Sequence, residues 1–436
     1  MEIGGNELGY PLSFREEDSQ VLGEHLHHRH SVDLIGMKRV GISNFLRYFL
    51  YHPEVKAKFI SKDEGHLFIR VDLNDLVERE LYPFWTLTFK RIIDEVERSK
   101  LPAVVQQKIA SSFLSSIQTN DLFLLIDGIR RSLNMIVAEG IYPTLFFLRF
   151  DRIKDVVTPE FFDNLQGLRD GSHGKIAYVF TSFRSLDALS PKAFTKADLS
   201  AFCHTLHIRP SNQSDIRVIA DHYKKRYGLS FSDTIEQELF RLVGGYVQYL
   251  QLALIILNEH KEDTINTPEQ LFSLLVQDER ITLQSEELWE SLTTVEKEAV
   301  GKVFQEEELS DEEQKEADYI FQTGMVETNK KKVSLFSPLF AQYVSLVFHH
   351  VGKMDRELVF SKKEHLLFTL LKEHTGEICE RDDIIEAVWP EYQEFGVSDW
   401  SIDRLVARVR SKLKKQASPY EIRTIRTRGY MLTERV

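Results

Sequence analysis

Two adjacent patterns near the C-terminus leave this part of the chain few ways to fold. SIDRLVARVRSKLKK, from Ser401 to Lys415, has apolar residues at the three-to-four spacing of a helix with one buried stripe. EIRTIRTRGYMLTE, from Glu421 to Glu434, alternates as a half-buried hairpin does, and Gly429 suits its reversal. We therefore predict an amphipathic helix followed by a hairpin. The predicted buried stripe consists of Ile402, Leu405, Val406, Val409 and Leu413.

The remaining residues of this helix and hairpin are strongly basic. Nine Lys and Arg residues lie between Arg404 and Arg428, against one acid, Glu421. The whole chain has a net charge of -12, whereas from Gly352 onward it has 16 basic and 15 acidic residues, so the excess acid lies upstream. Because most of the surface would repel phosphate, a polyanionic partner is expected to bind only at this local patch.

Three further motifs accompany the helix: FSKKEHLLFTLL, which contains Glu364, Leu367 and Leu370, IIEAVW, and the run from Ile422 to Leu432. With these motifs, the segment closely resembles the winged-helix effector domain of OmpR/PhoB-type response regulators. The resemblance implies that the helix lies in the major groove of double-stranded DNA while the hairpin, or wing, contacts phosphate or the minor groove. The residues implied in DNA binding are Arg404, Arg408, Ser411, Lys412, Lys415, Arg423, Arg426 and Arg428.

A protein-interaction module with a solvated basic face is the alternative for this segment. Solvated faces usually mix positive and negative charges, and this one does not. We therefore favour double-stranded DNA as the partner.

A second informative pattern lies near the N-terminus, between Ser31 and Leu50. A short apolar strand runs into the sequence GMKRVGIS and then into a helix, which is the layout of a phosphate-binding loop. The position that normally holds the phosphate-binding lysine is Ile42. Lys38 or Arg39 could substitute, although loss of hydrolysis is the better interpretation. The candidate nucleotide-binding residues are Gly36, Lys38, Arg39, Gly41, Ser43 and Asp151.

The surrounding sequence alternates between predicted strands and helices. Strands are predicted at 66–75, at 144–151 with Asp151 at its end, and at 175–185, and FWTLTFKRIIDEVERS is predicted to form a helix. With FREEDSQVL and RLVGGYVQYLQLAL, this order resembles the STAND and archaeal-type branch of AAA+-like ATPases. The resemblance implies a P-loop NTPase-like α/β domain with a helical lid, followed by two winged-helix domains.

Three departures from this family argue against an enzyme. Ile42 replaces the loop lysine, Arg152 stands where a catalytic glutamate follows the Walker B acid, and Val247 replaces the lid proline. We therefore expect the region before the C-terminal winged helix, called the body below, to be a pseudo-ATPase that serves as a scaffold. No cofactor is predicted for it. ATP or ADP with Mg²⁺ is the one cofactor class to be tested.

Length and motif order suggest four domains. We place the degenerate nucleotide-binding-fold domain at 1–205, the lid at 206–284, a first winged helix at 285–350 and the OmpR/PhoB-type winged helix at 352–436. The two cysteines lack metal-ligand spacing. No apolar run could span a membrane and no secretory signal is evident, so a cytoplasmic location is expected.

The segment HLHHRH, from His25 to His30, is the remaining metal candidate. Its spacing does not place three ligands on one helical face, and no cysteine is close in sequence, so we expect no metal site.

The sequence thus predicts a cytoplasmic, sequence-specific DNA-binding regulator whose body controls homo-oligomer assembly or contact with a protein partner. Two alternatives remain open. One is an ATP-dependent switch, resembling a replication initiator or a defence ATPase, that binds DNA. The other is an adaptor whose winged helices contact only proteins.

Overall fold

The computed structural model describes residues 9–61, 65–193, 202–261, 265–329, 332–351, 360, 362–388, 399–415, 418–425 and 428–434. The chain forms two compact units, Met1–Phe348 and His349–Val436. The three domains expected within residues 1–350 thus fall almost entirely in the first unit.

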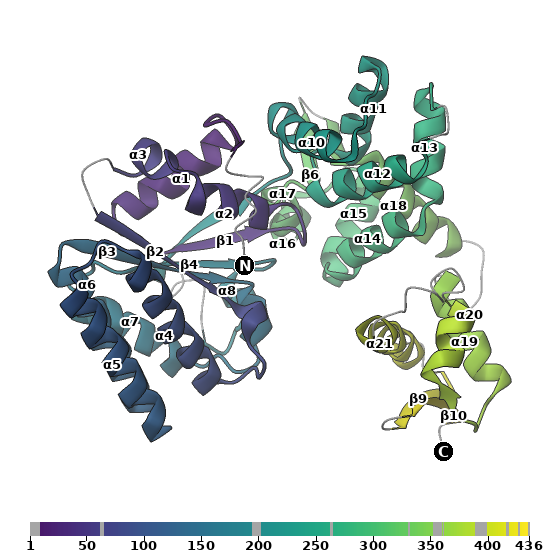
Figure 1. Cartoon of the computed structure of the whole chain (residues 1–436). Coiled ribbons are helices and arrows are strands. Elements are labelled where there is room, and N and C mark those ends of the chain that lie inside the picture. Colours follow the sequence, from purple (N-terminus) through teal and green to yellow (C-terminus); the bar gives the residue numbers. More distant parts are fainter. Residues whose placement is uncertain are drawn as a thin grey trace. The chain divides into compact units, whose positions relative to one another are not determined.

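A five-stranded sheet forms the centre of the first unit (Figure 1). Every neighbouring pair in it is parallel, and the strand order is β2-β3-β4-β1-β5. All residues of β1 and β4 are buried, which explains their continuous apolar character in the sequence. The strands are β1 (Val32–Gly36), β2 (Gly65–Asp72), β3 (Ile141–Leu148), β4 (Ala177–Ser182) and β5 (His204–Ile208).

Helices cover both faces of this sheet (Figure 1). Phe146 of β3 packs with α1, α2 and α3, whereas its neighbours Leu145 and Phe147 pack with α4 to α7, because successive strand residues face opposite sides. The predicted α/β fold class is confirmed. The helices are α1 (Glu16–His27), α2 (Ile42–Tyr51), α3 (Val55–Phe59), α4 (Leu81–Arg98), α5 (Ala103–Thr119), α6 (Leu122–Ala138), α7 (Pro159–Gly171) and α8 (Leu186–Leu189), with 3-10 turns η2 (Leu73–Asp75) and η3 (Phe150–Ile153).

A helical region follows the sheet and shares one continuous core with it. Thr293 and Glu296 form a capping box at the start of α15, and Thr267 and Gln270 form one at the start of α13. Further along the chain, β6 and β7 pair in antiparallel fashion. The elements are α10 (Gln213–Tyr227), α11 (Asp233–Val243), α12 (Val247–Glu259), α13 (Pro268–Gln277), α14 (Glu279–Glu290), α15 (Thr294–Phe304), α16 (Asp311–Glu316), α17 (Asp318–Gln322), β6 (Val326–Asn329), β7 (Lys332–Leu335) and α18 (Pro338–Val351).

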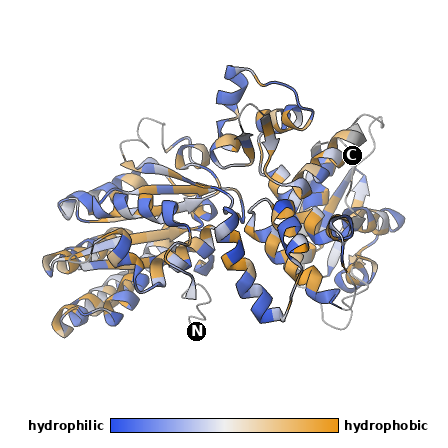
Figure 2. Cartoon of the chain, turned by 90° about the horizontal axis from the view of Figure 1, so that it is seen from above, coloured by the Kyte–Doolittle hydropathy of each residue, from blue (hydrophilic) through white to orange (hydrophobic). Residues whose placement is uncertain are grey.

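The second unit is a winged helix. Its antiparallel sheet has the order β8-β10-β9, and the predicted apolar stripe of the long helix is buried throughout. Figure 2 shows that the helices of the chain carry both hydrophobic and hydrophilic residues. Its elements are α19 (Lys362–Glu373), β8 (Cys379–Glu380), α20 (Arg381–Val388), α21 (Asp399–Lys415), β9 (Tyr420–Ile425) and β10 (Gly429–Glu434).

Gly245, in the turn between α11 and α12, tests how closely this turn packs against Ser211 in the first unit. Its φ is +71°, and a Cβ there would lie 2.0 Å from the carbonyl oxygen of Ser211. Gly245→Ala should therefore destabilise the protein by roughly 3 kcal/mol, through backbone strain and steric overlap. Gly140→Ala is the matched control, because Gly140 has φ +74° and open space around it, so only the strain of about 1 kcal/mol remains. Chemical denaturation measures the free energy of unfolding of both variants. An equal loss of stability in the two would contradict the close contact between Gly245 and Ser211.

Candidate nucleic-acid interface and the phosphate-loop edge

The predicted phosphate loop lies at the carboxyl edge of the parallel sheet. β1 ends at Gly36 and α2 begins at Ile42, so strand, loop and helix follow one another as predicted. Gly41 precedes the helix with φ +121°, a conformation that favours glycine. Ser43 is exposed in the first turn of α2. Such a helix N-terminus can offer backbone N–H groups to an anion.

The cationic side chains of this loop already have protein partners. Nε of Arg39 lies 3.0 Å from Oε2 of Glu287 on α14. The ammonium group of Lys38 lies 4.8 Å from the centre of the Phe183 ring. These two side chains are the ones that could replace the missing lysine. They would have to leave their present contacts to bind a phosphate.

The helical region covers the loop directly. The Tyr246 hydroxyl donates a hydrogen bond of 2.5 Å to the carbonyl oxygen of Lys38. A Cβ on Gly41 would lie 2.7 Å from Cγ2 of Val247, and a Cβ on Gly36 would lie 3.2 Å from Cδ1 of Ile42. Val247 and Ile42, which replace the family's proline and lysine, therefore pack apolar groups against the two loop glycines.

The structure corrects the predicted position of Asp151. β3 ends at Leu148 rather than at Asp151, which lies in the 3-10 turn η3. Arg149 follows the strand, with φ +60°, and its backbone N–H donates to Oγ1 of Thr181 at 2.9 Å. Burial raises the pKa of Asp151, although Lys38 and neighbouring arginines oppose this shift. The position just beyond the strand therefore holds Arg149, and Asp151 follows two residues later in the 3-10 turn.

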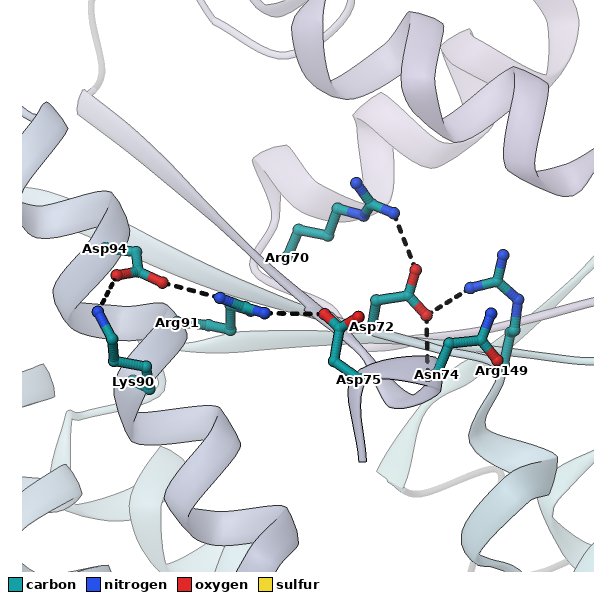
Figure 3. A network of polar contacts seen from close by, with 8 residues as sticks. All are labelled: Arg70, Asp72, Asn74, Asp75, Lys90, Arg91, Asp94 and Arg149. Atoms are coloured by element: carbon teal, nitrogen blue, oxygen red, sulfur yellow. Dashed lines mark hydrogen bonds and ion pairs between the residues drawn. The ribbon is translucent and has the colours of Figure 1, made fainter. Parts of the chain in front are cut away.

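Arg149 is part of a fixed polar network at the ends of β2 and β3 (Figure 3). It is paired with Asp72, whose other oxygen lies 2.8 Å from Arg70. The N–H of Asn74 donates to Asp72 at 3.1 Å, and Arg152 donates to the Asn74 side chain at 2.6 Å. Burial opposes ionisation of Asp72, but the hydrogen bonds from Arg149 and Asn74 lower the pKa of this carboxyl below its usual value. Arg152, at the expected glutamate position, thus helps to fix a structural network.

An ion pair joins the sheet to α15 of the helical region. Arg184, which follows β4, donates two hydrogen bonds of 2.6 Å to the carboxylate of Glu296 at the start of α15. It also donates to the carbonyl oxygen of Ser291 at 2.6 Å and lies 3.7 Å from the centre of the Tyr319 ring. These contacts fix the sheet and the helical region to each other within the first unit.

In the second unit, the exposed face of α21 differs from the predicted one. Ser411 is exposed as expected, and Asp403, Ala407 and Lys414 share its exposure. Lys414 was absent from the predicted site residues. The side chains of Arg404 and Lys415, and all of Arg426, lie outside the described residues.

Arg408 and Lys412 do not lie on this exposed face. Nζ of Lys412 is 2.6 Å from Oε2 of Glu364 on α19, and Nε of Arg408 is 3.5 Å from Oε1 of the same residue. Glu364 is fully buried, whereas both cations are partly exposed. Arg408 and Lys412 therefore lie on the side of α21 that packs against α19, and each remains partly exposed.

The wing is held against α21 by a second set of contacts. Arg410 donates to the carbonyl oxygen of Ile422 at 2.8 Å and to Oγ1 of Thr424 at 2.6 Å. The Tyr430 hydroxyl donates to Asp403, and this hydrogen bond lowers the pKa of that carboxyl. The relative positions of helix and wing are thus set by side chains that an alternation pattern cannot identify.

Arg423 and Arg428 are exposed on the wing, as expected. Arg423 lies 2.5 Å from Glu421 and Arg428 lies 3.5 Å from Glu380, and all four side chains are at least one-third exposed. Surface ion pairs of this kind contribute about 0–1 kcal/mol each, so they leave the arginines available to a polyanion. The exposed cations of helix and wing in the described part of the chain are Lys414, Arg423 and Arg428.

Comparison with known proteins gives a family for the second unit. Residues 355–432 match the model of the family described as transcriptional regulatory protein, C terminal. The transcriptional regulatory protein PcoR of Escherichia coli is 34% identical over 89 residues, which are 20% of this chain and 38% of PcoR. The chain therefore spans well under half of this relative's length. The predicted resemblance of the C-terminal segment to the effector domain of OmpR/PhoB-type response regulators is confirmed.

Solved structures resemble the chain over a longer stretch at low identity. The ORC2 protein of Aeropyrum pernix is 12% identical with a TM-score of 0.45, covering 80% of this chain and 99% of that one. The ORC1 protein of the same organism, solved in complex with DNA, is 12% identical with a TM-score of 0.42, covering 98% and 90%. No helix within the described ranges is both long and apolar enough to cross a membrane.

Proposed function

We propose that this chain, whose residues 355–432 match the transcriptional regulatory C-terminal family, is a sequence-specific regulator that binds double-stranded DNA through α21 and the wing. The observation that carries this proposal is the set of exposed cations Lys414, Arg423 and Arg428 on two elements that Arg410 ties together. A helix inserted into the major groove presents base-reading side chains, and flanking cations contact phosphates.

The exposed face of α21 suggests which residues would contact bases and which would contact phosphates. Ala407 and Ser411 are small and exposed, so the helix can approach base edges closely, and Ser411 can hydrogen-bond to them. Lys414, Arg423 and Arg428 would contact phosphates. Arg408 and Lys412 would instead hold the helix on α19 through Glu364.

Titrating a labelled duplex with the full chain at several salt concentrations tests DNA binding. Phosphate contacts release counterions, so log Kd should rise linearly with log salt, with a slope of about 0.9 per contact. Fluorescence anisotropy measures this slope. Binding that is absent, or that ignores salt, would contradict the proposed interface.

We also propose that the first unit is a pseudo-ATPase scaffold that controls assembly or contact with a partner. The absent lysine, the apolar contacts of Ile42 and Val247 with the loop, and the Asp72–Arg149 pair all support this role. Exposed apolar side chains on neighbouring helices offer a surface for such contacts. They are Val104 and Leu114 on α5 and Phe123 and Leu124 on α6.

Isothermal titration with ATP and Mg²⁺ tests the scaffold role. No saturable heat and no phosphate release are expected, because Ile42 replaces the phosphate-binding lysine and Arg152 replaces the catalytic glutamate. The same titration with ADP controls for product-like binding. Micromolar affinity with measurable phosphate release would instead favour the ATP-dependent switch, for which the retained glycine geometry of the loop is the supporting observation.

A further inference from the structure

Three histidines from separate segments meet at the amino edge of the parallel sheet. His25 lies in the last turn of α1, His30 lies in the connection to β1, and His204 begins β5. One ring nitrogen from each lies within 4.8 Å of the other two. This group lies at the opposite edge of the sheet from the phosphate loop, so the proposed function does not involve it.

The backbone fixes these three positions. The N–H of His30 donates to the carbonyl oxygen of His25 at 2.8 Å, and the N–H of His204 donates to that of Ser31 at 2.8 Å. β1 and β5 pair in parallel with Val32 opposite His204. The group is therefore built by the pairing of β5 with β1, which the sequence spacing of HLHHRH does not reveal.

The nearest cationic residue in the segment is anchored elsewhere. Arg29, between His28 and His30, donates to the carbonyl oxygen of Pro143 at 2.7 Å and to Oγ1 of Thr144 at 3.2 Å. Its guanidinium is thereby tied to β3 instead of to the histidine group.

The three rings offer unused lone pairs. Burial, followed by repulsion from His204, lowers the pKa of His25 and of His30. Across the described ranges, none of these three rings makes a hydrogen bond. The rings contact one another instead, with centroids 4.6 Å apart from His25 to His204 and from His30 to His204. Neutral imidazole nitrogen is a preferred ligand of zinc and of other late first-row transition metals.

We propose that His25, His30 and His204 form a binding site for a divalent transition-metal ion of the zinc type, with a fourth position left for water. Nitrogens bound tetrahedrally to zinc at 2.0–2.1 Å lie about 3.4 Å from one another, so the rings must move together by roughly 1 Å. Rotation of the side chains about their χ angles accomplishes this without a change of backbone. A bound ion would link α1, the loop before β1 and β5.

Isothermal titration of the full chain with ZnCl₂, after removal of metals by a chelator, tests the site. The wild type should bind one equivalent, and His204→Gln should bind at least about 10-fold more weakly, since loss of a ligand costs no less than loss of an outer-shell partner. His27→Gln is the matched control, because His27 belongs to the same histidine-rich segment but not to the group, and it should bind as the wild type does.

Two further measurements separate ligand loss from misfolding. Co²⁺ should give the visible absorption of a four-coordinate ion in the wild type and in His27→Gln, and not in His204→Gln. ZnCl₂ should raise the Tm of the wild type and leave that of His204→Gln unchanged, because binding stabilises only the state that has the site. His30→Gln, altered in the loop instead of the sheet, should behave as His204→Gln does.

Either of two results would overturn the proposal. One is equal zinc affinity in wild type, His204→Gln and His30→Gln, which would mean that exposed histidines bind zinc adventitiously. The other is no saturable binding by the wild type, which would mean that the rings only pack against one another.

Discussion

Replacing Lys414, Arg423 and Arg428 together with alanine is expected to weaken binding of double-stranded DNA by about 100-fold at 0.15 M salt. Each phosphate contact contributes roughly 0.7 log units of affinity at this concentration through counterion release, and three contacts would be lost. The slope of log Kd against log salt should fall by about 3 at the same time. Anisotropy titrations at several salt concentrations measure both quantities.

The matched control removes the same charge from the first unit. Arg98, Arg131 and Arg241 are exposed, and each lies within 3.0 Å of an acid on its own helix. Their replacement by alanine should leave affinity and slope within about twofold of the wild type, because they lie outside the proposed interface. If both triple variants lost the same affinity, net charge would explain the binding and the interface would be wrong.

The double variant Arg408→Ala/Lys412→Ala is expected to destabilise the second unit by about 3 kcal/mol. Glu364 has no exposed surface, and the substitutions take away two cations that compensate its charge. The amide hydrogens of α19 and α21 should therefore exchange faster in the full chain, while those of the first unit stay unchanged. Hydrogen exchange followed by mass spectrometry measures each helix separately.

Adding Glu364→Gln to this double variant provides the control. A neutral amide has no charge to bury, so part of the lost protection in α19 and α21 should return. If the double variant exchanged as the wild type does, Glu364 would not hold α21 in place. A loss of DNA affinity in Arg408→Ala alone would then have to be attributed to contact with DNA.

The periodic features of the second unit could be predicted from the sequence. The stripe from Ile402 to Leu413 is buried, because in a short helix a single apolar face has only one core to pack against. The orientation of Arg408 and Lys412 could not be predicted in the same way. Both lie on the flank of the helix, where the position of α19 and its Glu364 decides whether a cation meets solvent or an acid.

In the first unit, too, some features could be predicted from the sequence and others could not. The strand–loop–helix layout around Gly36 and Gly41 follows the glycine spacing and is present. Asp151 was misplaced because the buried Phe150 follows Arg149 after strand pairing has stopped at Leu148, and hydropathy does not record where pairing stops.

Contacts between distant segments were the least predictable features. The group of His25, His30 and His204 depends on the pairing of β1 with β5, which is a property of the sheet order and leaves no periodic signal. The helices α5 and α6 were not predicted either, because no family motif or strand alternation marks residues 103–138.

In-vitro selection of DNA bound by the full chain, with and without ATP and Mg²⁺, tests the central claim most directly. A DNA-reading second unit on a scaffold that does not use ATP should enrich one sequence motif, and the same motif should appear under both conditions. Failure to enrich any motif, or enrichment only when ATP is present, would contradict this account.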